Sequence, residues 1–137
     1  MSTQHHLFIS HSWAYGKNYE SLIEKLRERA YFSFSNYSVP KDDPIHTNGT
    51  AKQLQEAIEQ KMKPCGVIII LAGVYATYSK WINEEIKIAK KYNKPILAIE
   101  PWGAEKTSVV VKQAAEENGK IVKWNTESIV AAIRELD

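Results

Sequence analysis

The sequence predicts an α/β protein in which a central five-stranded parallel sheet is covered by helices on both faces. Short aliphatic runs alternate along the chain with longer segments whose apolar residues recur at helical spacing. The most apolar run, 67–71, contains no polar residue, as expected for a strand buried on both faces of a parallel sheet. Alternating strands and helices imply right-handed crossovers and a three-layer sandwich.

Each element follows from its local pattern. Apolar runs predict strands at 7–9, 32–34, 67–71, 95–99 and 121–122. Apolar residues three or four apart predict helices at 19–26, 51–62, 78–92, 109–117 and 129–136. Pro64 fixes the end of the second helix, because proline cannot continue a helix. The polar segment 35–50 is too long for an ordinary connection, and such loops are usually functional.

Length and charge restrict the possible functions. The chain has 137 residues, 44% of them hydrophobic, which predicts a single domain over 1–137. Its 18 Lys and Arg and 16 Asp and Glu residues leave a net charge of +2. This balance argues against a nucleic-acid-binding protein, which needs a cationic excess on one face.

Other features argue against membranes, disulfides and metals. No apolar run approaches the roughly 20 residues of a transmembrane helix, and the amino terminus lacks a signal-peptide pattern, so we expect a cytoplasmic protein without membrane contact. Cys65 is the single cysteine, which excludes an internal disulfide. No metal site is expected, because the histidines lack ligand spacing: His5, His6, His11 and His46.

Ligands of parallel α/β sheets bind at the carboxyl ends of the strands, where the strand order reverses. The residues that follow the first two predicted strands include Ser10, His11, Ser12, Trp13, Asn36 and Tyr37. The serines can bind phosphate or ribose, or cap a turn, and the histidine can contact a ligand or the backbone. The aromatic rings can stack on a nucleobase or close the core. Cys65 precedes its strand at the opposite edge, which favours a buried residue over a catalytic thiol.

Glu85 lies in the middle of the apolar face of the third predicted helix. Its helical neighbours are Trp81, Ile82, Ile88 and Ala89, so no lysine or arginine of the same helix can neutralise it. Burying a carboxylate is costly unless hydrogen bonds or a ligand compensate. Glu85 therefore either holds a neighbouring loop or faces a ligand, and we favour the ligand, because unusual carboxylates cluster at functional sites.

Four segments carry a resemblance to a known family: 8–13, 36–40, 71–75 and 79–86. Through these segments, the chain over essentially its whole length resembles the TIR domain superfamily, and most closely its bacterial TIR-like branch, which includes Thoeris antiphage defence proteins. The resemblance implies a flavodoxin-like/TIR sandwich. Catalytic TIR domains carry a glutamate four residues after a tryptophan on this helix, and Glu85 after Trp81 matches that spacing, whereas Glu84 does not.

The resemblance implies an enzyme that breaks the bond between nicotinamide and ribose in NAD+, with Glu85 as the catalytic residue. NAD+ is then a substrate, and no separate cofactor is implied. The loop after Asn36 would cover one end of NAD+, while Tyr37 or Trp13 would stack on it. The implied substrate-binding residues are Ser10, His11, Ser12, Trp13, Asn36, Tyr37, Ser38, Pro40 and Trp81.

Similarity to Thoeris proteins implies a cyclic ADP-ribose signal that a separate effector protein senses during phage infection. TIR enzymes commonly self-associate through TIR surfaces, so self-association on activation is also implied. Linear ADP-ribose remains an alternative product, since the sequence does not decide whether water or adenine attacks the ribose.

Other functions remain open or are disfavoured. A non-catalytic TIR–TIR interaction module would tolerate a neutral residue at Glu85. A nucleoside deoxyribosyltransferase would use the glutamate as a covalent nucleophile. A phospho-acceptor receiver needs acidic residues at positions 10–12 and 72–73, where this chain has none. No GxGxxG motif follows the first strand, which disfavours classical dinucleotide binding.

Overall fold

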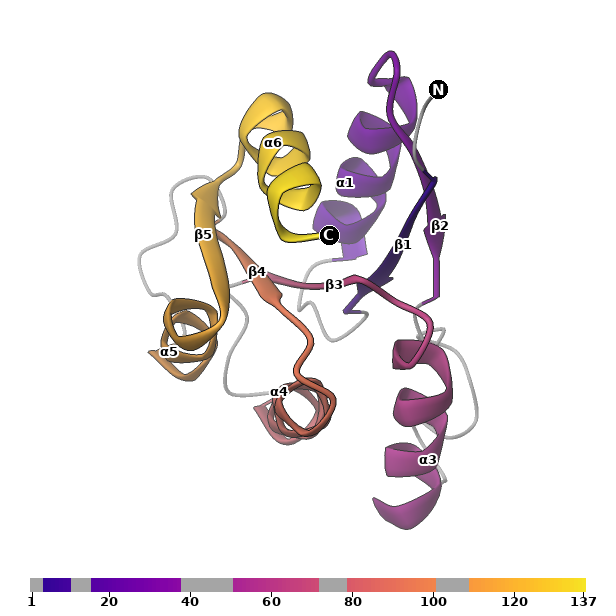
Figure 1. Cartoon of the computed structure of the whole chain (residues 1–137), viewed down its shortest axis with the longest axis vertical. Helices are drawn as coiled ribbons and strands as arrows, with labels where there is room; N and C mark the ends of the chain where they lie inside the picture. Colours follow the sequence, from indigo (N-terminus) through magenta and orange to yellow (C-terminus); the bar gives the residue numbers. More distant parts are fainter. Residues whose placement is uncertain (1–3, 11–15, 38–50, 72–78, 101–108) are drawn as a thin grey trace.

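The computed structural model describes residues 4–10, 16–37, 51–71, 79–100 and 109–137. A parallel sheet forms the middle layer, with the strand order β2-β1-β3-β4-β5 (Figure 1). Its strands are β1 (Gln4–Ile9), β2 (Ser33–Asn36), β3 (Val67–Leu71), β4 (Ile96–Glu100) and β5 (Gly119–Lys123). The predicted α/β sandwich with a five-stranded parallel sheet is confirmed.

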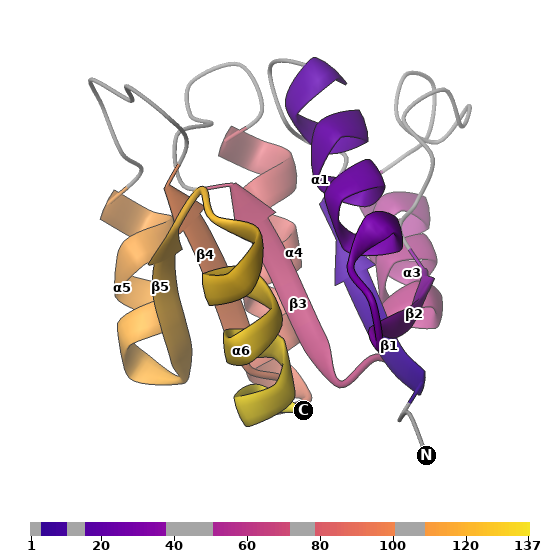
Figure 2. The same ribbon diagram turned by 90° about the horizontal axis from the view of Figure 1, so that it is seen from above.

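Helices form the two outer layers. They are α1 (Gly16–Glu28), α3 (Ala51–Met62), α4 (Ser79–Lys91), α5 (Val109–Glu117) and α6 (Thr126–Leu136). Helices α1 and α6 cover one face of the sheet, and α3, α4 and α5 cover the other (Figures 1 and 2). Among the residues that the structure describes, no helix is both long enough and apolar enough to cross a membrane.

The most apolar predicted strand lies at the centre of the sheet. All five residues of β3 are buried, and the strand pairs with β1 on one side and β4 on the other. Ile69 is the partner of Ile9 in β1 and of Leu97 in β4. The chain passes from β1 outward to β2 and then returns to β3, so the strand order reverses between β1 and β3. Ligands of such sheets bind at this reversal.

Several elements extend beyond the predicted apolar runs because polar residues find partners there. Strand β1 begins at Gln4, whose side-chain amide donates to the Ser35 hydroxyl at 2.8 Å. Helix α6 begins at Thr126 because Asn125 caps it: the Asn125 side chain accepts a hydrogen bond from Ser128 N at 3.0 Å. Neither feature can be predicted from hydrophobic periodicity.

Strand β5 begins at a position that only glycine can occupy. Gly119 has a φ of 151°, and a Cβ atom there would lie 1.8 Å from the Ile96 carbonyl oxygen. The absence of a side chain lets β5 pair closely with β4, where Gly119 is the partner of Ile96. The predicted strand at 121–122 is therefore the middle of a longer strand.

The two histidines of β1 point to opposite faces of the sheet. His5 is buried, stacks on Phe32 with ring centroids 5.2 Å apart, and has its Nδ1 atom 2.5 Å from Asp137 Oδ2 at the end of α6. His6 Nδ1 instead lies 2.8 Å from the Tyr37 hydroxyl. Since successive side chains of a strand alternate, Phe8 and Ser10 share the face of His6.

The contact between His5 and Asp137 predicts a stability effect. The change Asp137→Ala leaves a buried imidazole nitrogen without this partner, which costs about 1–3 kcal/mol in the free energy of unfolding. Urea denaturation followed by circular dichroism measures this change. Glu135→Ala is the matched control on the same helix, because Glu135 pairs with Lys120 in an exposed ion pair of little energetic value. Equal destabilisation by the two variants would contradict the prediction.

Candidate active site

Glu85 lies on the buried face of α4. Its side chain is 1% exposed, and Ile82, Ile86 and Ala89 on the same helix are also buried. The neighbouring Glu84 is half-buried, and the helical repeat places it on a different face of α4 from Glu85. The position of Glu85 in the apolar face, predicted from the helical pattern, is confirmed.

The partner of this carboxylate comes from the first strand. Ser10, which directly follows β1, donates a hydrogen bond from its Oγ atom to Glu85 Oε1 at 2.7 Å, and both residues are buried. The Ser10 backbone N–H donates to the Ile69 carbonyl oxygen of β3 at 3.0 Å. Ser10 is therefore held between β1 and β3, at the carboxyl ends of the two strands where the strand order reverses.

The hydroxyl orients the carboxylate without neutralising it. A serine hydroxyl carries no charge, whereas an ionised carboxylate is an acceptor of hydrogen bonds only. The 2.7 Å distance is the usual length of an O–H···O hydrogen bond, and donation to an ionised carboxylate is stronger than donation to a neutral acceptor. A negative charge held in a water-poor environment can stabilise a positive charge that develops close to it.

The structure places the other predicted residues of the second strand apart from this pair. Asn36 is the exposed last residue of β2. Tyr37 is half-buried, and its backbone N–H donates to the Leu7 carbonyl oxygen at 2.9 Å. Its hydroxyl reaches His6, which lies about 13 Å along the strand from Ser10 at about 3.3 Å per residue. The hydroxyl of Tyr37 therefore points toward the amino half of β1.

Several predicted contacts lie outside the described residues. They are His11, Ser12, Trp13, Ser38 and Pro40. The backbone of Trp81 belongs to α4, one turn before Glu85, but its side chain is outside the description. Substrate binding by all of these residues stays a prediction.

The sequence pattern identifies Ser10 and Glu85 as separate candidates and does not predict the contact between His6 and Tyr37. Alternation along β1 was the available signal for both contacts. His6, Phe8 and Ser10 fall on one face of the strand, and from that face Ser10 reaches Glu85 of α4.

Cys65 is a buried residue at the opposite edge of the sheet, as predicted. Its side chain is 1% exposed, and the Sγ–H group donates to the Lys61 carbonyl oxygen at 3.2 Å. Burial raises the pKa of the Cys65 thiol to about 12, because the thiolate would lose its hydration. Lys94 opposes this rise and Asp137 adds to it. The thiol is therefore protonated at neutral pH and is no nucleophile.

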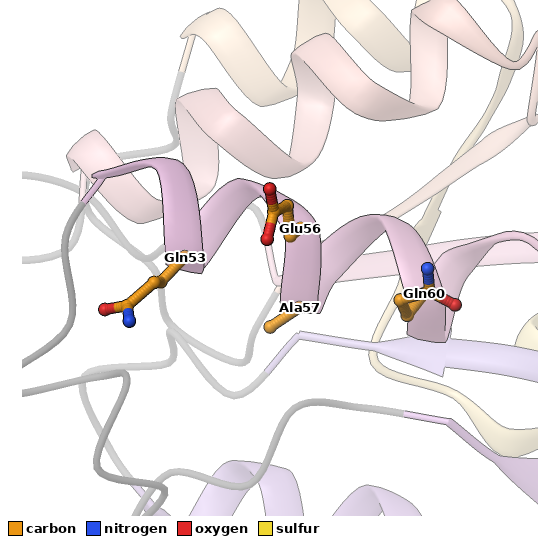
Figure 3. A pocket seen from close by; sticks show the side chains of 4 residues that line it. All are labelled: Gln53, Glu56, Ala57 and Gln60. Carbon is orange, nitrogen blue, oxygen red and sulfur yellow. The ribbon is translucent and has the colours of Figure 1, made fainter.

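A surface depression lies on α3, and its lining includes neither Ser10 nor Glu85 (Figure 3). Its lining consists mainly of exposed polar side chains: Gln53, Glu56, Ala57 and Gln60. Such an open surface lacks the enclosure that small-molecule sites usually have. The buried Ser10 and Glu85 pair is the stronger candidate for chemistry.

Comparisons with known proteins agree with this fold. The family model described as "Thoeris protein ThsB, TIR-like domain" matches residues 8–106, a range that contains both Ser10 and Glu85. A crystal structure of a conserved protein from Enterococcus faecalis V583 is similar with a TM-score of 0.65, at 12% identity, over 97% of this chain and 99% of that chain. At that identity, the likeness shows the fold alone. Comparison with curated protein sequences gives no match.

The state of Cys65 can be tested with a thiol reagent. A thiol with a pKa of about 12 holds about 1000-fold less thiolate at neutral pH than one with the ordinary value of 9.0. We expect the native protein to react with iodoacetamide at least about 100-fold more slowly than the same protein unfolded in guanidinium chloride. Mass spectrometry of the alkylated chain follows both rates. Similar rates in the two states would show that Cys65 is accessible and reactive.

Proposed function

The chain belongs to the family of the TIR-like domain of the Thoeris protein ThsB, and we propose that it is an enzyme that cleaves NAD+ between nicotinamide and ribose. The observation that carries the proposal is the buried Glu85 carboxylate, which Ser10 holds at the carboxyl edge of the sheet. The residues implied to bind NAD+ by resemblance to TIR enzymes include Ser10.

The proposed reaction starts with departure of nicotinamide. The bond between ribose C1′ and the nicotinamide nitrogen breaks, and its electron pair leaves with the nitrogen. Because that nitrogen is positively charged in NAD+, nicotinamide leaves as a neutral molecule without needing a proton. One carboxylate therefore suffices, whereas most glycosidases need a second group as the acid.

Glu85 would stabilise the positive charge that remains on the ribose. Departure of nicotinamide leaves an oxocarbenium-like ribose, and a fixed carboxylate beside it lowers the energy of that state. The same carboxylate can accept hydrogen bonds from ribose hydroxyls. Burial strengthens the attraction, because little water is present to screen the charge.

The second half of the reaction decides the product. Attack of water on C1′ gives ADP-ribose and releases a proton, whereas attack by a nitrogen of the substrate's own adenine closes a ring and gives cyclic ADP-ribose without addition of water. Membership of a Thoeris family favours a cyclic ADP-ribose product made in antiphage defence. We propose that a separate effector protein senses this product and that the domain self-associates through its TIR surfaces on activation.

A specific observation also supports a second candidate function. The hydrogen bond from Ser10 partners the Glu85 carboxylate and ties α4 to the end of β1. Such a contact also suits a non-catalytic TIR–TIR interaction module, in which Glu85 serves only to hold the helix on the sheet. In that case, Glu85 affects stability and no reaction depends on it.

Nicotinamide release from NAD+ tests the proposal. We expect Glu85→Gln to lower the rate at least about 100-fold relative to the wild type, because the amide has no negative charge to stabilise the ribose. Products separated by mass and retention time distinguish ADP-ribose from cyclic ADP-ribose, which is lighter by one water. High protein concentration is required, since self-association would otherwise limit the rate.

Glu84→Gln is the matched control, because it makes the same chemical change one residue away on α4. It should retain the wild-type rate. If no sample consumes NAD+, even in extracts of phage-challenged cells, the interaction module becomes the better function. Equal activity of Glu85→Gln and the wild type would remove Glu85 from the chemistry.

A further inference from the structure

We propose that Ser10 is a positioning residue, which acts by holding the Glu85 carboxylate in one orientation rather than by donating a hydrogen bond to the substrate. The inference deepens the proposed function and rests on it. It assigns a definite task to a side chain that resemblance places only among the residues that bind NAD+.

The donor capacity of serine limits the role of Ser10. A serine hydroxyl has one proton, and in this structure that proton goes to Glu85 Oε1 at 2.7 Å. A hydroxyl engaged in this way can accept a hydrogen bond from a ligand but cannot donate one to a phosphate or a carbonyl oxygen. A donor role toward NAD+ would require the buried bond to Glu85 to break first.

The two side chains differ in how firmly the fold holds them. Ser10 has a short side chain on a backbone that is tied to β3 by the bond from Ser10 N to Ile69 O at 3.0 Å. Glutamate has three rotatable side-chain bonds, so its carboxylate can sweep a much larger volume. Attaching Oε1 to a rigid strand end therefore fixes the direction of the whole carboxylate.

Catalysis by charge stabilisation depends on this fixation. A displacement of about 1 Å of a catalytic group can reduce a rate about 100-fold. A preorganised group also needs no reorientation at the moment when charge develops on the ribose. The complete burial of Ser10 keeps water from competing for the carboxylate oxygen that it holds.

The test measures kcat, KM and the pH dependence of nicotinamide release for Ser10→Ala and Ser10→Thr. We expect Ser10→Ala to lower kcat about 10- to 100-fold, the range for loss of a hydrogen bond to a charged group. The acid limb of its pH–rate profile should move to higher pH, because the ionised carboxylate has lost a donor. Ser10→Thr keeps a hydroxyl and should recover most of the kcat.

Ser35→Ala is the matched control, since this strand serine accepts a hydrogen bond from Gln4 and has no contact with the pair. Its kcat should equal that of the wild type. Thermal unfolding and circular dichroism of every variant verify the fold. A purely structural Ser10 would lower the unfolding temperature of Ser10→Ala but leave its kcat and pH profile unchanged.

The outcomes separate this inference from the proposed function. If the wild type is active and Glu85→Gln is not, a kcat for folded Ser10→Ala within twofold of the wild type overturns the positioning role alone, whatever its KM. A loss of kcat that folded Ser10→Thr fails to restore also overturns it, because the hydroxyl would not be the cause. If the wild type releases no nicotinamide, the proposed function fails, and the positioning role fails with it.

Discussion

The hydrogen bond between Ser10 and Glu85 joins two elements that lie 75 residues apart in the sequence and places a carboxylate inside the protein. Removing an ionised carboxylate from water is costly, and the cost is tolerated where a hydrogen-bond donor compensates. The bond therefore forms only if the end of β1 and the Glu85 face of α4 lie within hydrogen-bond distance of each other. The rest of the fold sets this relative position.

Three features of the fold bring the two side chains together. The parallel pairing of β1 with β3 sets the height of Ser10 at the carboxyl edge of the sheet. The alternation of side chains along β1 directs Ser10 toward the layer of helices that contains α4. The buried isoleucines around Glu85 hold α4 with one face against the sheet, so the carboxylate on that face cannot turn to solvent. The carboxylate is thus placed by core packing together with the hydrogen bond from Ser10.

In the proposed reaction, one hydrogen bond would serve both stability and chemistry. The donor that makes burial of the carboxylate tolerable also restricts its direction, and a restricted charge is what stabilisation of a cationic ribose requires. At the opposite edge of the sheet, a carboxylate is also paired with a buried side chain: Asp137 contacts the His5 ring, and this contact stabilises the fold. At that edge the buried thiol of Cys65 is protonated and takes no part in chemistry.

Much of the fold was predictable from the sequence because hydrophobic periodicity reports burial directly. The aliphatic run of β3 and the apolar face of α4 are local patterns, and the anomalous place of Glu85 on that face follows from them. The partner of Glu85 was not predictable, because a contact across 75 residues depends on strand register and helix rotation. The direction of the Tyr37 side chain was not predictable either. Its aromatic ring suggested a stacking surface, but the direction of its hydroxyl depends on the contact with His6.

The strands predicted from the sequence at 7–9 and 121–122 are shorter than the observed β1 and β5. Polar residues at the start of β1 broke the apolar pattern although each has a partner in the folded protein. The tight approach of Gly119 to Ile96 carries no hydrophobic signal at all. Local propensity therefore identified the elements, whereas tertiary contacts set their ends.

The proposed reaction requires Glu85 to face the reacting ribose. A crystal structure with an NAD+ analogue whose nicotinamide bond cannot be cleaved would show whether it does. We expect the ribose next to nicotinamide to lie within hydrogen-bond distance of the Glu85 carboxylate, with Ser10 still bonded to Oε1. An analogue bound elsewhere, for example in the depression on α3, with Glu85 enclosed by protein alone, would contradict it.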